Sequence, residues 1–226
     1  MEQKRIEILK VVVGSVAHGL ANEKSDTDYR GIFVIPTSDL LRIGPHIDQT
    51  NWIEGKVDDT SWELGKFLFL ATKCNPTILE TFLSPIVRLA NNYQKIGDDI
   101  RALFPYIWNS DGVKNAFIGY GLNQRRKFFD NQDSRAPKYA CAYLRTLYNA
   151  QELLSTGTFT IRVGDTEVGD TLRRFKNGDY EVGEVIQKCF DMETRVLKAY
   201  KENPTKQTNM EPVNEFLLKV RKEFWE

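Results

Sequence analysis

Residues 14–31 have the sequence GSVAHGLANEKSDTDYRG, which joins a Gly-Ser turn to a pair of carboxylates over a short distance. The stretch before it, IEILKVVV at residues 6–13, is apolar and β-branched and stops at Gly14-Ser15. That pattern is typical of a buried strand ending in a tight turn. The stretch YRGIFVIP at residues 29–36 predicts a second strand, ended by its proline. Between the strands we expect one or two helical turns and a polar loop.

The two carboxylates of this stretch, Asp26 and Asp28, enter the second strand. Strand residues at i and i+2 point to the same face, with Cα atoms about 6 to 7 Å apart. This spacing suits a shared site for Mg²⁺ or Mn²⁺, which prefer oxygen ligands. Gly14 lets the chain approach a phosphate closely, and Ser15 offers a hydroxyl and a backbone N–H next to the start of the short helix. The pattern favours a pocket shared by cations and a polyphosphate.

A third strand is predicted over residues 55–62, GKVDDTSW, because Val57, Asp59 and Ser61 alternate with Asp58, Thr60 and Trp62 across the pleat. Beyond it the pattern changes to helical spacing, apart from a possible edge strand in IVRLA at 86–90. Glycines Gly157 and Gly178 stand where helix C-caps are expected. Helices are predicted over 61–74, 76–84, 92–104, 112–130, 137–157, 168–178, 183–203 and 212–225.

This layout predicts an α+β fold, with a sheet-containing domain at residues 1–105 followed by an all-helical domain at residues 106–226. The chain has 226 residues, of which 41% are hydrophobic and 27% charged, as in folded globular proteins. The formal net charge is zero, so contact with nucleic acid would need a local basic patch. The three separated cysteines and the short apolar stretch near the N-terminus predict a cytoplasmic protein without disulfides or membrane insertion.

The pattern GS…G…SDxD in residues 14–28 resembles that of the DNA polymerase beta nucleotidyltransferase superfamily. Within it, the chain is similar to predicted nucleotidyltransferases encoded beside RNA ligases in some bacteria and phages. The likeness runs from about residue 6 to the C-terminus. It implies a small mixed-sheet domain like the polymerase beta palm, covered by a helical domain that holds the nucleotide and the acceptor. The segments that carry it are GSVAHGL, SDTDYRGIFV, DDTSWELGKFLFLATKCNPTILETFLSP, LRTLYNAQELLSTG and LRRFKNGDY.

The resemblance implies a third carboxylate on a later strand, which completes a metal site with Asp26 and Asp28 and acts as general base on the acceptor hydroxyl. Its position in DDTSWEL favours Asp58, with Asp59 as the alternative. Neighbouring strand residues face opposite sides, so only one of the two can join the others.

The resemblance also places basic side chains on the phosphates of a nucleotide. His18 follows the Gly-Ser turn, where a phosphate contact and a helix-packing role are both open. Lys138 and Arg145 are seven residues apart and so share one face of a helix, where contact with the β- and γ-phosphates is implied. The cluster Arg125, Arg126 and Lys127 is interpreted as a solvated face.

The activity implied is transfer of an NMP from an NTP, with ATP as the expected substrate, to an acceptor hydroxyl. An RNA or tRNA end is the expected acceptor. Two alternatives stay open: AMP transfer onto a protein hydroxyl, as in antitoxins of the same superfamily, and a non-catalytic nucleotide-binding module.

Overall fold

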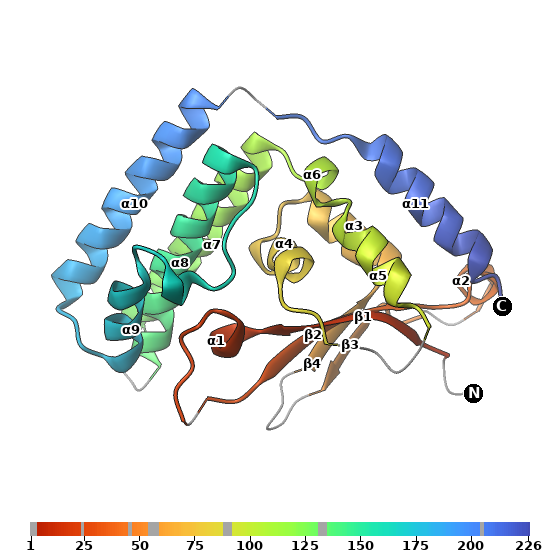
Figure 1. Ribbon diagram of the computed structural model, residues 1–226, viewed down its shortest axis with the longest axis horizontal. Helices are drawn as coiled ribbons and strands as arrows, with labels where there is room; N and C mark the ends of the chain where they lie inside the picture. Colours follow the sequence, from red (N-terminus) through yellow and green to blue (C-terminus); the bar gives the residue numbers. More distant parts are fainter. Residues whose placement is uncertain are drawn as a thin grey trace.

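The computed structural model describes residues 4–23, 25–44, 47–53, 59–87, 92–130, 135–203 and 206–226. A four-stranded mixed sheet lies at one side of the molecule, and helices cover one of its faces (Figure 1). The helices then continue into a largely helical C-terminal part. The predicted α+β class is therefore confirmed.

The sheet has the strand order β1-β2-β4-β3. Strands β1 and β2 are antiparallel, β2 and β4 are parallel, and β3 and β4 are antiparallel. The three predicted strands are present, whereas β3 was not predicted because four residues carry too short a pattern to be recognised before pairing. The bounds are β1 Ile6–Val13, β2 Asp28–Val34, β3 Thr50–Ile53 and β4 Asp59–Glu63.

The two faces of the sheet differ in what covers them. Pairing of Leu9 with Ile32 and of Val11 with Arg30 puts these side chains on one face. Leu9, Val11 and Ile32 are buried in the hydrophobic core, so this is the helix-covered face. The opposite face carries Lys10 and the residues in register with it, which are less apolar.

The predicted edge strand after residue 85 forms only a short contact with β1. Val12 donates its N–H to the Pro85 carbonyl at 2.9 Å, and Val87 donates to the Lys10 carbonyl at 2.8 Å. Ile86 makes an isolated antiparallel bridge with Val11. Residues 88–90 of the predicted strand lie outside the described residues.

The helices match the predicted segments and add two short ones, α2 and α6. Asn75 caps α4 by accepting from the N–H groups of Thr77 and Ile78. Gly157 and Gly178 end α8 and α9 at positive φ of 87° and 79°, as predicted. The bounds are α1 Gly14–Ala17, α2 Thr37–Leu41, α3 Leu64–Thr72, α4 Pro76–Leu83, α5 Gln94–Arg101, α6 Phe104–Ile107, α7 Ser110–Asp130, α8 Ala136–Thr156, a 3₁₀ turn Val163–Asp165, α9 Gly169–Asn177, α10 Val182–Glu202 and α11 Met210–Glu223.

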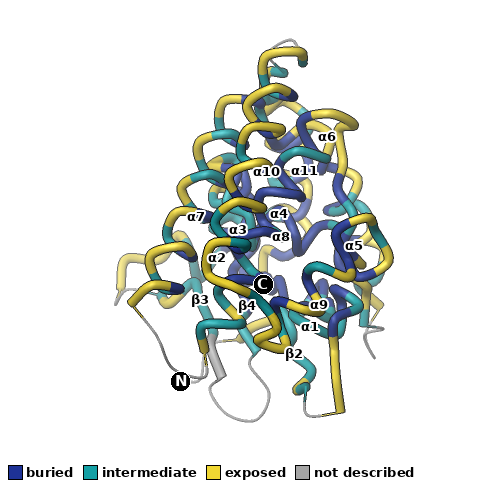
Figure 2. Tube along the Cα trace, turned by 90° about the vertical axis from the view of Figure 1, so that its left-hand side faces the viewer, coloured by how far each residue is buried: buried dark blue, intermediate teal, exposed yellow. Residues whose placement is uncertain are grey.

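Helices α4 and α8 are largely buried, whereas α10 keeps one exposed side (Figure 2). The C-terminal helix α11 returns to the sheet-containing part of the molecule (Figure 1). There, Arg221 pairs with buried Glu63 at 2.6 Å, and Thr37 donates its N–H to the Phe224 carbonyl at 2.8 Å. The division into domains after residue 105 stays a prediction. Among the described residues, no helix is both long and apolar enough to cross a bilayer.

Candidate functional site

The Gly-Ser turn lies directly against the second carboxylate of the SDTD sequence. Val13 and Asp28 are paired at the ends of β1 and β2, so the turn that follows Val13 meets the start of β2. A Cβ added to Gly14 would lie 2.4 Å from Asp28 Oδ2. Gly14 also has a φ of 68°, which L side chains rarely adopt. The backbone conformation therefore favours a glycine here, and a side chain at this position would displace the Asp28 carboxylate.

Asp26 lies in the loop before β2, where its side chain is exposed. The preceding turn is held by Ser25, whose hydroxyl accepts from the Asn22 N–H at 2.9 Å and donates to Asn22 Oδ1 at 3.1 Å. Asp58 lies outside the described residues. Within the residues that are described, no three His, Cys, Asp or Glu side chains gather closely enough to hold a metal ion.

Asp59, the alternative third carboxylate, faces away from Asp28. The pairing of Tyr29 with Asp59 in β2 and β4 puts both on one face, and Asp28 precedes Tyr29 on the other. Asp59 instead accepts a charge-assisted hydrogen bond from Lys10 Nζ at 2.6 Å. The pairing of β2 with β4 therefore puts Asp59 and Asp28 on opposite faces of the sheet.

His18 and Arg145 come together on a shared carboxylate, Glu80 of α4. His18 Nε2 lies 2.6 Å from Glu80 Oε1, and Arg145 Nη1 donates to Glu80 Oε2 at 3.2 Å. Glu80 is only 8% exposed. This buried cluster joins α1, α4 and α8, and so links the Gly-Ser turn to the helical part of the chain.

The pKa values in this cluster have a common electrostatic origin. Burial disfavours the charged form of Glu80, but Arg145 and His18 outweigh it and hold the pKa of Glu80 well below its usual range. Burial lowers the pKa of His18, and the positive charge of Arg145 lowers it further, against the opposing effect of Glu80. The cluster thus consists of an ionised Glu80–Arg145 pair and a neutral histidine near pH 7.

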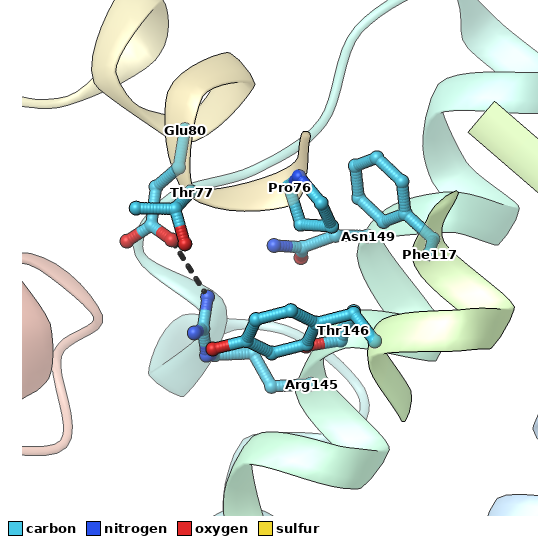
Figure 3. Close-up of a pocket in the computed structure, with 8 residues that line it drawn as sticks. Pro76, Thr77, Glu80, Phe117, Arg145, Thr146 and Asn149 are labelled. Carbon is cyan, nitrogen blue, oxygen red and sulfur yellow. Dashed lines mark hydrogen bonds and ion pairs between the residues drawn. The ribbon is translucent and has the colours of Figure 1, made fainter. Parts of the chain in front are cut away.

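A small pocket lies beside the Glu80–Arg145 pair, between α4, α7 and α8 (Figure 3). Arg145 and Glu80 form one wall, and Phe117 lies across the pocket from them. Asn149 is 3% exposed, and its side-chain oxygen has no hydrogen-bond partner. The other lining residues are Pro76, Thr77, Tyr120 and Thr146.

The remaining predicted phosphate contact, Lys138, is exposed in the first turn of α8. Arg145 lies two turns further along, about 10 Å away along the helix axis. Of the predicted phosphate-side residues, the structure brings His18 and Arg145 together but leaves Lys138 apart from them.

The sequence did not indicate Glu80 as part of this cluster. Glu80 stands among the buried residues Ile78, Leu79 and Phe82 of α4, and a charged residue on such an apolar helix is the signal that could have marked it.

Protonation of His18 is expected to destabilise the fold in acid. Because its pKa is lowered from 6.5 in the folded protein, the folded state binds fewer protons than the unfolded one. The contribution of this pKa shift to the free energy of unfolding is therefore fully present above pH 6.5. It falls as the pH drops toward the folded pKa, by up to about 1.4 kcal/mol per pH unit. Protonation of Glu80 adds a further loss of stability below pH 4.5, because the pKa of Glu80 is also lower in the folded protein.

Urea unfolding of wild type and His18→Gln at pH 7.5 and 5.5 measures this effect. The glutamine can still donate to Glu80 but does not titrate. A smaller loss of stability between the two pH values is expected in the variant. An equal loss in both proteins would exclude His18 as its source.

Two comparisons with known proteins found sequences similar to this chain. The family model described as RNA repair pathway DNA polymerase beta family matches residues 2–219. The chain is 26% identical over 253 aligned positions to the uncharacterized protein YcgL of Bacillus subtilis strain 168, covering 99% of this chain and 95% of that protein. Since the family model matches nearly the whole chain, the protein belongs to the RNA repair pathway DNA polymerase beta family.

Proposed function

We propose that this protein is a metal-dependent nucleotidyltransferase that moves an NMP from an NTP, with ATP as the expected substrate, to the hydroxyl of an RNA or tRNA end. The observation that carries the proposal is the close approach of Gly14 to Asp28, where a side chain on the turn would displace the carboxylate. A phosphate approaching the Gly-Ser backbone would therefore come close to a group that can hold its cation.

The donor set is suitable for magnesium or manganese. Asp26 is exposed and Asp28 is half-buried, so both are oxygen donors at the surface of the site. Hard divalent cations prefer such ligands to nitrogen or sulfur. Asp26, Asp28 and Asp58 would hold the ion, and the bound ion would neutralise the charge that develops on the phosphates.

The chain's own residues then orient the reactants. Ser15 offers its hydroxyl and N–H to a phosphate oxygen, and Lys138 and Arg145 approach the phosphates from α8. Asp58 accepts the proton of the acceptor hydroxyl, since Asp59 points to the other face of the sheet. The acceptor oxygen forms a bond to the α-phosphorus, and the bond from the α-phosphorus to the bridging oxygen breaks, so that pyrophosphate leaves with the electron pair.

Incubation with each α-³²P-labelled NTP and magnesium, in the presence of an RNA pool or a cell extract, tests this function. Label covalently attached to RNA is the expected result. Label on protein would instead support AMP transfer to a protein hydroxyl. Nucleotide binding without any transfer would support a non-catalytic module, and both of these outcomes would contradict the RNA proposal.

A further inference from the structure

Lys176 of α9 reaches back to the loop that leads into the SDTD sequence. Its Nζ donates to the Leu20 carbonyl at 2.5 Å and to Ser25 Oγ at 3.3 Å. These contacts join positions 156 and 151 residues apart. The ammonium group therefore contacts Ser25, which directly precedes Asp26, and Leu20, which follows the short helix of the Gly-Ser turn.

Within the part of the chain that the structure describes, the charge of Lys176 has no counterion. Both of its partners are neutral oxygens, and no carboxylate of the described residues pairs with it. Its neighbours on α9 differ, since Arg173 pairs with Asp170 at 2.9 Å and Arg174 pairs with Glu184 at 2.9 Å. The lysine is half-buried, and burial lowers its pKa. An ammonium in this setting gains most from a negatively charged partner.

The charged groups of the described residues near Lys176 do not neutralise it. Its charge acts on buried His18 and Cys141, so it faces the region between α1 and α8. Arg145 lies in the same region, and its ion-pair partner Glu80 is shared with His18. Since Glu80 pairs with Arg145 and His18 is neutral near pH 7, the charge of Lys176 stays unbalanced among the described residues of this region.

We propose that Lys176 binds the phosphates of the nucleoside triphosphate. The inference rests on the proposed function, and it adds α9 to the elements that hold the substrate. No residue of α9 is among the phosphate contacts implied by the family resemblance, which are confined to the Gly-Ser turn and α8. A polyphosphate supplies the missing negative charge, and the flexible lysine stem lets Nζ move from the Leu20 carbonyl to a phosphate oxygen.

A purely structural role for Lys176 would be to tie the Leu20–Ser25 loop to α9. The variant Ser25→Ala separates the two roles, because it removes one of the loop contacts and leaves the ammonium group in place. If the lysine binds phosphate, Ser25→Ala keeps triphosphate affinity close to wild type. If the lysine only holds the loop, Ser25→Ala weakens binding in part, because the contact with Leu20 remains, and Lys176→Met weakens the binding of AMP as much as that of a triphosphate.

Calorimetric titration measures the affinity for a triphosphate directly. The ligand is an ATP analogue with a methylene bridge between the α- and β-phosphorus, and magnesium is present. Lys176→Met is expected to lower the affinity for the analogue by about tenfold or more, since a hydrogen bond to a charged group is lost. The affinity for AMP, titrated in parallel, should change by less than about threefold, because the lost contact is to phosphates that AMP lacks. Lys176→Arg should retain most of the affinity.

The matched control is Lys188→Met, which removes an exposed lysine of α10 and should leave binding unchanged. Thermal unfolding shows that each variant is folded, and Lys176→Gln takes the place of the methionine variant if that one unfolds. Equal analogue affinity in wild type and Lys176→Met would overturn the inference and leave the proposed function standing. Failure of the wild type to bind any of the four triphosphates would instead contradict the proposed function itself.

Discussion

Asp28→Asn is expected to reduce nucleotidyl transfer by at least about 100-fold while leaving the fold intact. The substitution preserves the size of the side chain next to Gly14 but removes the negative charge that would hold the cation. Because phosphoryl transfer depends on positioning and charge neutralisation, losing a metal ligand affects the rate far more than the stability. The rate of labelled NMP incorporation, measured beside thermal unfolding, tests both parts of this expectation.

Asp59→Asn is the matched control for this experiment. It removes a carboxylate from the adjacent strand, but from the opposite face of the sheet, where Asp59 pairs with Lys10. Transfer by Asp59→Asn is expected to stay within a few-fold of wild type, since the ion pair that it breaks lies on the face opposite Asp28. Wild-type rates in Asp28→Asn would remove the proposed mechanism, and equal losses in both variants would contradict the assignment of faces.

Glu80→Ala is expected to destabilise the protein by about 3 to 5 kcal/mol, the usual cost of breaking a buried ion pair by removing one partner. The variant would leave the guanidinium of Arg145 buried without its carboxylate, and His18 without its hydrogen-bond acceptor. Urea unfolding at pH 7.5 measures the change in free energy of unfolding.

Glu167→Ala provides the comparison, because it breaks the ion pair with Arg195, in which both side chains are well exposed. That variant should lose no more than about 1 kcal/mol. If Glu80→Ala were as stable as Glu167→Ala, the cluster at Glu80 would not contribute to the link between α1, α4 and α8.

Local sequence patterns predicted the elements that have strong signals of their own. Strand β1 is largely apolar and stops just before Gly14, and α8 ends at Gly157, so both could be recognised without knowledge of the tertiary structure. The short elements β3, α2 and α6 were not predicted. Each has five residues or fewer, and β3 depends on pairing with β4 rather than on a pattern of its own.

The candidate site shows the same division between local and long-range information. The approach of Gly14 to Asp28 follows from two strands joined by a short connection, which the sequence displays. The contacts of Glu80 join it to residues 62 and 65 positions away, and Lys176 contacts a carbonyl 156 positions away. Such contacts depend on how the helices pack, so no local pattern could predict them.

A crystal structure with a non-hydrolysable NTP analogue and magnesium tests the central claim most directly. The account predicts phosphates against Gly14 and Ser15, with metal density between the phosphates and the carboxylates of Asp26 and Asp28. A nucleotide bound elsewhere on the molecule, or one in this place with no metal at either carboxylate, would contradict it.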